Sequence, residues 1–418
     1  MSLGKGTYCG VMNQTVSHVA VSIALLSGVI GLSAQSPQVV TIKAARIVDG
    51  RGNVLRDSII TVTGSRITAV NPQTSRTSPI TYDLRNATLM PGMIDVHVHL
   101  NYFFGPGGKY GERNVPADYE RQAVEANARD TLMAGFTTVQ SLGWSGDREL
   151  REAIASGRVA GPRLLTSLEQ IIPQPTDTPA QLRQRVREDA QNGADVIKLF
   201  ASASVRDGGK MNVTVEQIAA VCGEAKAQGL RSLVHAHDSQ SIIASVNAGC
   251  SEIEHGMYAD AAAIKAMKDA NVYFDPNIGV VLQNYIEHKN QYVGTGNYTE
   301  AGFAFMEQVV PTLPAIFKNA LAAGLRMPVG TDAVAGAHGH NAREIIIRVR
   351  DGGQKPMDAI VSATSVSADS LKLGKTIGTI KPGYQADIVA VAGNPLEDIG
   401  ALESVIFVMK GGTVFRMP

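Results

Sequence analysis

The sequence predicts an α/β protein: a (β/α)8 TIM barrel with a small β-sandwich domain built from both ends of the chain. Three observations predict this fold. Strand and helix patterns alternate through the middle of the chain, strand patterns dominate near both ends, and side chains of metal-binding types follow several of the middle strands.

The middle of the chain alternates apolar strand runs with segments of helical period. The expected strands are residues 94–99, 136–142, 163–167, 194–200, 231–235, 252–255, 272–275 and 327–332. Helical segments between them include 119–134, 180–192, 215–228 and 239–248, each followed closely by a glycine suited to a helix C-terminus. A doubly wound open sheet is the alternative. Eight strands with metal-type residues at several strand ends favour the closed barrel, whose active site lies where its strands end.

Both ends of the chain have a different pattern. Short strands are expected at 40–44 and 58–62 around a turn, and strand patterns return at 386–391 and 405–409. We therefore expect a discontinuous β domain of residues 35–91 and 376–418, with the barrel at 92–375.

The composition limits the classes of protein. The chain of 418 residues has no formal net charge and is 44% hydrophobic, which is enough for a large core and more than one domain. Balanced charge gives no reason to expect binding to nucleic acid or to an anionic membrane. The three cysteines, Cys9, Cys222 and Cys250, are far apart in the sequence and make no disulfide framework.

Residues 1–34 resemble a signal peptide and leader. Lys5 precedes a continuous apolar run at 19–32, and small residues follow the run. The run is shorter than a membrane span requires, and a hydrophobic first element of the fold is the alternative. We expect a bacterial protein that is secreted or periplasmic, begins near Gln35 after cleavage and has no remaining contact with the membrane.

Five of the nine histidines form two pairs and a singleton that close apolar runs: His97 and His99, His235 and His237, and His255. Residues i and i+2 of a strand point to the same face, so His97 and His99 can bind one ion together. Histidine and carboxylate suit zinc and similar metals, whereas structural zinc sites more often use cysteine. The pattern indicates a catalytic metal site; buried histidines that only form hydrogen bonds are the alternative.

Lys198 and Asp332 complete the pattern. Lys198 interrupts the apolar run at 196–200, where a charged amine is costly to bury. Either an ion pair neutralises it, or it is an uncharged nucleophile that takes up carbon dioxide and, as a carbamate, bridges two cations. Asp332 ends the last expected strand, where it can bind a metal and accept a proton from metal-bound water, or cap a following helix.

These residues and their neighbours resemble the amidohydrolase superfamily over nearly the whole chain after the leader. The motifs that carry the resemblance are 91–99, Lys198, His235, His255-Gly256, 330–332 and the downstream run 380–389. The segments 131–139, 254–256 and 339–344 are more similar to the branch related to imidazolonepropionase. That branch includes Xaa-Pro dipeptidases and carboxypeptidases that release lysine or arginine.

The resemblance implies a site with two divalent metal ions, with zinc as the expected metal. His97, His99 and Asp332 would hold one ion, and His235 and His255 would hold the other. Lys198, carboxylated by carbon dioxide to a carbamate, would bridge the two ions.

Three further side chains are candidate substrate contacts. The resemblance makes the first histidine of the second pair the ligand, which leaves His237 for the substrate. Arg206 follows the fourth strand, where it could bind a carboxylate, and His338 lies in a glycine-rich loop after Asp332. For Arg206 and His338, a solvated loop position is the alternative. Peptidase-like relatives usually carry a Gly-Gly-His-Gly stretch after the third strand, but residues 165–173 contain no histidine.

We therefore expect a binuclear metal-dependent amidohydrolase that cleaves an amide bond in a dipeptide or N-acyl amino acid. The expected mechanism is attack by a metal-bridging hydroxide, with Asp332 as general base and acid. The alternatives are a mononuclear deaminase or cyclic-amide hydrolase, a lactonase or esterase on the same site, and a non-catalytic secreted binding barrel. The expected partner is a small-molecule substrate, with a homo-oligomer as an open alternative.

Overall fold

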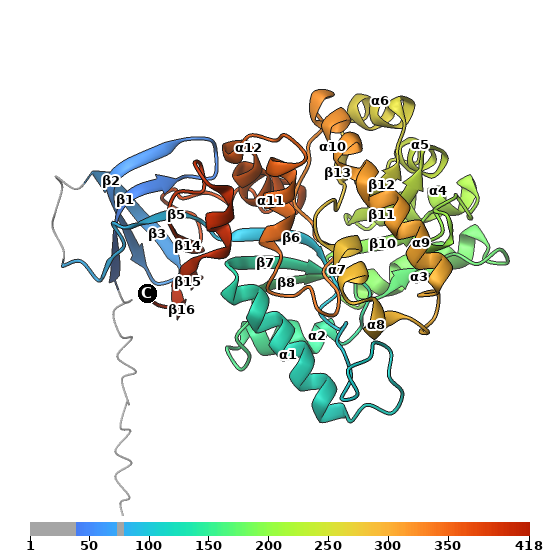
Figure 1. Ribbon diagram of the computed structural model, residues 1–418, viewed down its shortest axis with the longest axis horizontal. Helices are drawn as coiled ribbons and strands as arrows, with labels where there is room; N and C mark the ends of the chain where they lie inside the picture. Colours follow the sequence, from blue (N-terminus) through green and yellow to red (C-terminus); the bar gives the residue numbers. More distant parts are fainter. Residues whose placement is uncertain (1–38, 73–78) are drawn as a thin grey trace, which may run out of the picture. The chain divides into compact units, whose positions relative to one another are not determined.

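The computed structural model describes residues 39–72 and 79–418 as a sheet of strands from both ends of the chain and a parallel barrel surrounded by helices (Figure 1). The expected α/β class with a separate terminal sheet is thus confirmed. The leader expected at 1–34 lies outside the described residues. Among the helices described, none has the length and apolar character needed to cross a membrane.

The terminal sheet joins strands from both ends of the chain. Its strands are β1 (Val39–Val48), β2 (Val54–Thr63), β3 (Arg66–Pro72), β4 (Tyr82–Asp83), β5 (Ala87–Pro91), β14 (Ile388–Ala392), β15 (Val405–Lys410) and β16 (Thr413–Arg416). They are ordered β16-β15-β14-β5-β1-β2-β3, with β4 beside β1. The central pair, β5 and β14, is antiparallel and connects the two ends of the chain.

This sheet folds over its own core. The backbone N–H of Ile67 donates to Tyr384 O at 2.9 Å, and that of Ala386 donates to Ser65 O at 2.8 Å, so the β2–β3 hairpin meets the segment before β14. Apolar side chains from alternate strand positions fill the space between, and Ile42 and Phe407 are fully buried there.

The barrel consists of two parallel sheets. One contains β6 (Met93–Val98), β7 (Phe136–Ser141) and β8 (Arg163–Thr166). The other contains β9 (Gln170–Ile171), β10 (Val196–Phe200), β11 (Arg231–Asp238), β12 (Glu252–Tyr258) and β13 (Tyr273–Asp275). The helices are α1 (Ala117–Met133), α2 (Asp147–Ala155), α3 (Pro179–Gln191), α4 (Val215–Ala227), α5 (Ser239–Asn247), α6 (Ala261–Asp269), α7 (Val281–Glu287), α8 (Lys289–Tyr292), α9 (Glu300–Val309), α10 (Leu313–Ala322), α11 (Ala342–Arg350), α12 (Pro356–Val361) and α13 (Ser367–Ser370).

The helix ends follow the chemistry expected from the sequence. Thr178 and Thr214 begin α3 and α4 with capping boxes, in which each threonine accepts a hydrogen bond from a backbone N–H three residues later. Gly193 and Gly229 follow these helices with φ of 86° and 75°, a left-handed conformation that glycine adopts without steric cost. The chain can therefore return directly into the next barrel strand.

The eighth expected strand, residues 327–332, is not a regular strand, which corrects the sequence-based prediction. The segment still closes the barrel: Val96 N donates to Val329 O at 2.9 Å, and Asp332 N donates to His97 O at 2.8 Å. Buried carboxylates take two of its other backbone donors, since Gly330 N donates to Asp275 and Thr331 N to Asp95. Side-chain acceptors thus replace some of the backbone hydrogen bonds that a regular strand would form with its neighbours.

The third barrel strand is broken in two. Leu168 has a φ of 60°, which is unusual for a branched residue and separates β8 from β9. As a result β8 pairs with β7, whereas β9 pairs with β10 and places Gln170 opposite Lys198. The strand predicted at 163–167 corresponds to β8, and the short strand β9 was not predicted.

A disulfide joins Cys222 in α4 to Cys250, just after α5, across a sequence separation of 28 residues. The sequence did not predict this bond because the cysteines are far apart along the chain. The packing of α4 against α5 brings their Cα atoms to 5.1 Å.

Candidate active site

A cavity of about 220 Å³ lies at the ends of the barrel strands. All of the ligand candidates from the sequence line it: His97, His99, Lys198, His235, His255 and Asp332. They come from five separate parts of the barrel, so the fold brings together residues up to 235 positions apart in the chain.

Regular strands supply one wall of the cavity. Along β10, Ile197 and Leu199 pack outward under the helices. Alternation therefore turns Lys198 inward. The same alternation along β11 brings His235 and His237 into the cavity. Their rings meet edge to face, with centroids 4.4 Å apart.

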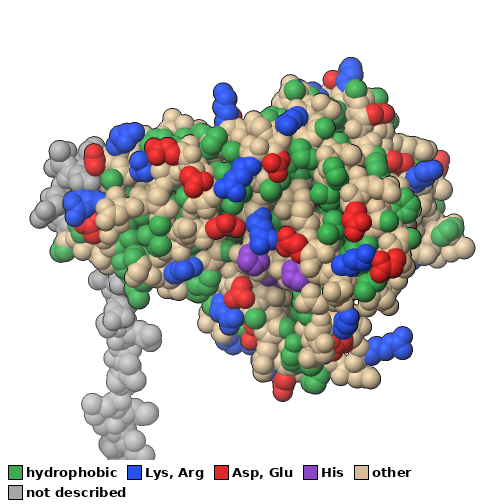
Figure 2. Space-filling model, viewed as in Figure 1, with side chains coloured by type: hydrophobic (Ala, Val, Ile, Leu, Met, Phe, Trp, Pro, Cys, Tyr) green, Lys and Arg blue, Asp and Glu red, His purple; other side chains and the backbone are tan. Residues whose placement is uncertain are grey.

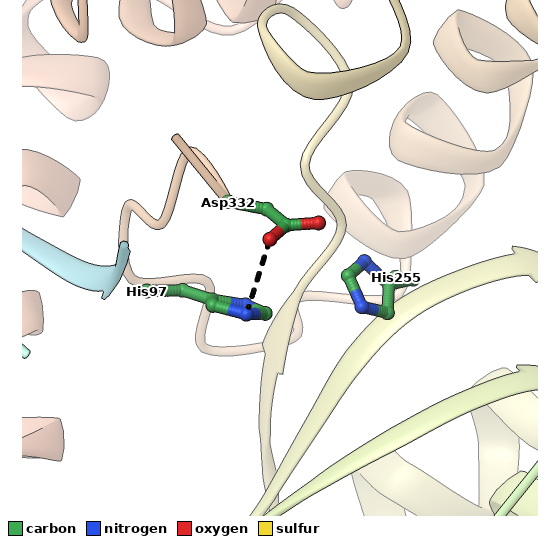
Figure 3. Close-up of side chains that lie close together, drawn as sticks. All are labelled: His97, His255 and Asp332. Atoms are coloured by element: carbon green, nitrogen blue, oxygen red, sulfur yellow. Dashed lines mark ion pairs between the residues drawn. The ribbon is translucent and has the colours of Figure 1, made fainter. Parts of the chain in front are cut away.

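Left-handed backbone supplies two of the other ligand candidates, His255 and Asp332. In Figure 3, His97, His255 and Asp332 face a common space, and a dashed line joins His97 to Asp332. The Oδ1 atom of Asp332 lies 3.4 Å from His97 Nε2 and 3.1 Å from His99 Nε2. His255 and Asp332 have φ of 70° and 51°. This left-handed conformation is uncommon outside glycine, and such strain is concentrated at functional sites.

The positive φ of His255 explains how it reaches the cavity. Ile253, two residues before it on the same strand, packs in the outer core beneath the helices. Strict alternation would therefore turn His255 outward as well. The left-handed turn releases the side chain from that direction, and its ring centroid lies 4.6 Å from that of His235 and 5.4 Å from that of His97.

Burial sets the charge state of the site. It lowers the pKa of His97 and His255 well below the usual histidine value, so these imidazoles are neutral. Burial likewise lowers the pKa of Lys198, which is only 1% exposed. Among the described residues Lys198 forms no ion pair; its Nζ lies 3.4 Å from His97 Nε2. The structure therefore gives no support to the ion-pair alternative for this lysine.

The donor set suits a divalent metal ion. One ligand-type atom each from His97, His255 and Asp332 lies within 4.8 Å of the other two. In addition, Nδ1 of His255 is buried and has no hydrogen-bond partner among the described residues. Neutral imidazoles and a carboxylate are ligands of zinc and its neighbours.

Glu254 is a buried carboxylate beside the ligand candidates, and the sequence-based prediction assigned it no role. Its Oε2 accepts a hydrogen bond at 2.7 Å from Nδ1 of His97, which leaves Nε2 free to face the cavity. Both side chains are almost completely buried. The signal was present in the strand, because Glu252 and Glu254 are two carboxylates on one face of an apolar run.

His97, Glu254 and Asp275 also approach one another closely enough to bind a metal. Several of their ligand atoms already have protein partners, however. Glu254 holds His97 Nδ1, and Asp275 pairs with the buried Arg348 at 3.0 Å. This group therefore supports the cavity from behind rather than forming a second metal centre.

Arg206 lies in an aromatic part of the cavity wall. Its guanidinium carbon is 4.1 Å from the ring centroid of Tyr298 and 5.2 Å from that of Tyr285. Its Nε donates to Asn297 at 3.0 Å, and the Tyr298 hydroxyl donates to that of Tyr285 at 3.1 Å. The tyrosines lie some 80 to 90 residues after Arg206, and no local pattern marked them.

Comparison with known families matches residues 88–415 to the amidohydrolase family. The chain belongs to this family. It is a metal-dependent hydrolase of amide bonds, and the sequence-based identification is confirmed.

Individual relatives of this amidohydrolase agree with the assignment. Ochratoxinase of Aspergillus niger is 27% identical over 440 residues, covering 92% of this chain and 88% of the relative. Imidazolonepropionase of Deinococcus deserti is 24% identical over 392 residues, which cover 84% of this chain and 88% of the relative. A solved Xaa-Pro dipeptidase with methionine bound in its active site superposes with a TM-score of 0.81. It is 29% identical and covers 91% of this chain and 100% of its own.

Two of the three predicted substrate contacts of the amidohydrolase line the cavity, and the third does not. His237 and Arg206 line the cavity. His338 does not, which corrects the prediction: it lines another cavity, near α1 and β15, and lies near the backbone of His99 and Tyr102. The turn after Asp332 carries His338 behind the ligands.

Gln170 and Ile172 fill the position after the third strand, where the sequence lacks the expected histidine. Both line the cavity. The only hydrogen bond that the Gln170 amide makes within the described residues is a long one, 3.4 Å to Leu142 O. A neutral amide therefore stands beside Lys198.

Charged side chains are mixed over the outer surface. On the face drawn in Figure 2, acidic and basic side chains of the described residues are interspersed. This distribution matches the balanced charge of the sequence.

Proposed function

We propose that this amidohydrolase is a binuclear zinc enzyme that cleaves the amide bond of a dipeptide or N-acyl amino acid. His97, His99 and Asp332 would hold one ion, His235 and His255 the other, and carboxylated Lys198 would bridge them. When bound, the ions would activate a water molecule and polarise the substrate carbonyl. The observation that carries the proposal is the buried Lys198, which has no ion-pair partner among the described residues and lines the cavity with all five other ligand candidates.

The surroundings of Lys198 favour its carboxylation. Its uncharged amine would add to carbon dioxide, forming a nitrogen–carbon bond and releasing one proton. The product is an anion with two oxygens in place of a buried neutral amine. Because no carboxylate of the described residues pairs with Lys198, burial as an ammonium would be costly.

Asp332 is the group suited to proton transfer. Its Oδ1 contacts His97 in β6 and His99 just after it, whereas Oδ2 has no hydrogen-bond partner among the described residues. Oδ2 would take a proton from the attacking water and deliver it to the leaving amine.

Arg206 and the tyrosines beside it would bind the substrate carboxylate. The guanidinium supplies charge, and the tyrosine hydroxyls supply hydrogen bonds. The solved Xaa-Pro dipeptidase holds an amino acid, methionine, in its active site, which supports a subsite of this kind. His237 would contact the substrate beside His235.

The test is a screen of dipeptides and N-acyl amino acids with protein supplied with zinc and bicarbonate. We expect release of a free amino acid, about two zinc ions per chain by elemental analysis, and a carbamate carbon by ¹³C NMR with labelled bicarbonate. A stoichiometry near one ion with no carbamate signal would instead favour the mononuclear deaminase or cyclic-amide hydrolase.

We also propose that the protein works outside the cytoplasm, in the periplasm or the medium. The expected leader at 1–34 supports this, and so does the disulfide between Cys222 and Cys250, since disulfides persist in oxidising compartments. Mass spectrometry of the protein from fractionated cells should find a chain that begins near Gln35 in the exported fraction. A full-length chain confined to the cytoplasm would contradict export.

A further inference from the structure

The proposed function includes two substrate classes, dipeptides and N-acyl amino acids. The charges around the cavity distinguish between them. Asp332 is the only acidic residue among the described residues that line the cavity, and the wall also carries the cationic Arg206. The other buried carboxylates nearby, Glu254 and Asp275, lie behind His97 and are held by it and by Arg348. They are not available to a ligand in the cavity.

A dipeptide would bring a free ammonium group next to the scissile carbonyl. Taking that charge out of water without an anionic partner is strongly unfavourable. On the proposed function the difficulty increases, because two divalent ions bring more positive charge than Asp332 and the carbamate offset. An N-acyl group of the same shape carries no charge and avoids this penalty.

The wall near Lys198 has the chemistry that a neutral acyl group requires. Gln170 stands opposite Lys198 in the parallel ladder and offers one amide donor and one amide acceptor. Ile172, Phe200 and Met257 line the same cavity with apolar surface.

We propose that the enzyme selects N-acyl amino acids with a neutral, largely apolar acyl group over dipeptides with a free amino terminus. Gln170 contacts the acyl group, and Arg206 binds the carboxylate of the amino acid. This inference rests on the proposed function, and it narrows the substrate class of the same site.

Isosteric substrate pairs provide the test. N-propionyl-leucine and glycyl-leucine differ by a methyl group in place of an ammonium, as do N-isobutyryl-leucine and alanyl-leucine. We expect kcat/KM at neutral pH to be about 10-fold or more higher for the acyl member of each pair. The gap should narrow between about pH 7 and pH 9, as the dipeptide loses its proton near pH 8.

Equal or faster hydrolysis of the dipeptides at neutral pH would overturn the inference and leave the proposed amide hydrolysis intact. If metal-loaded protein hydrolyses neither member with leucine, phenylalanine, methionine or proline as the amino acid, the proposed function is overturned and the inference with it.

A matched pair of variants tests the charge argument directly. Ile172 is 48% exposed, so a polar side chain can be placed there without loss of core packing. Ile172→Glu adds a carboxylate to the cavity wall, and Ile172→Gln is its neutral control. We expect the ratio of dipeptide to N-acyl kcat/KM to be about 10-fold higher in the glutamate variant than in the glutamine variant. Equal ratios in the two variants would contradict selection by charge.

Discussion

The two walls of the cavity are built in different ways. Lys198, His235 and His237 come from regular strands and reach the interior by simple alternation. His255 and Asp332 instead reach it from left-handed backbone, with φ of 70° and 51°. The geometry of the regular wall is set by the backbone hydrogen bonds between parallel strands. The backbone of the irregular wall is strained, and contacts with the surrounding residues must offset the energy of that strain.

The largest expected effect concerns Asp332 on the irregular wall, because it combines a ligand and the proton carrier. Asp332→Asn should lower kcat by on the order of 10⁴-fold. Asparagine tolerates left-handed backbone, so the urea midpoint should change little. A variant that retains most of its turnover would remove Asp332 from the mechanism.

Lys198 is the corresponding test on the regular wall. Lys198→Ala should lose zinc and lower kcat/KM by on the order of 10³-fold, since several kcal/mol of charge stabilisation disappear. Added acetate or propionate should restore part of the activity by supplying the missing anion. Lys198→Arg serves as the control, because it keeps a cation but cannot form a carbamate, and it should not recover with bicarbonate.

Glu254 lies behind the irregular wall and should act on the metal through His97. Glu254→Gln should weaken zinc binding by about 10- to 100-fold in competition with a chelator. The matched control is Glu252→Gln, on the same face of β12, whose partner is Arg231 at 3.9 Å rather than a ligand. Equal zinc affinities in the two variants would show that the His97 contact has no positioning role.

The smallest expected effect is on protein stability, and it compares the backbone strain of the two walls. His255→Val and His255→Asn both remove an imidazole, but valine is disfavoured at positive φ. The free energy of unfolding of the His255→Val variant should therefore be about 1–3 kcal/mol lower than that of the His255→Asn variant, measured by urea unfolding of the metal-free protein. At His235 on β11, valine should be at least as stable as asparagine, because β-branched residues suit strands. The same order at both positions would mean that the walls do not differ in strain.

Periodicity and residue type could predict the regular half of this protein. Strand alternation predicted the shared face of His97 and His99, residue type marked Lys198 as an unusual charge in an apolar run, and the resemblance gave a role to each ligand. The glycines after α3 and α4 and the strands at both ends of the chain were also evident locally. These features depend on steric rules that operate over a few residues.

Contacts between distant segments could not be predicted in this way. The disulfide from Cys222 to Cys250, the pairing of Glu254 with His97 and the aromatic surroundings of Arg206 depend on how separate elements pack. His338 was placed near the substrate because its loop follows Asp332, but the direction of a loop is decided by the residues it packs against.

The sequence by itself determined which chemical groups the site contains and which strands carry them, because residue type and period are local properties. Only the tertiary structure decided how those groups meet. The break at Leu168 sets Gln170 opposite Lys198, the turn at His255 reverses its side chain, and buried carboxylates replace the ladder at residues 327–332. Each of these depends on backbone dihedrals and hydrogen bonds that are fixed only when the barrel closes.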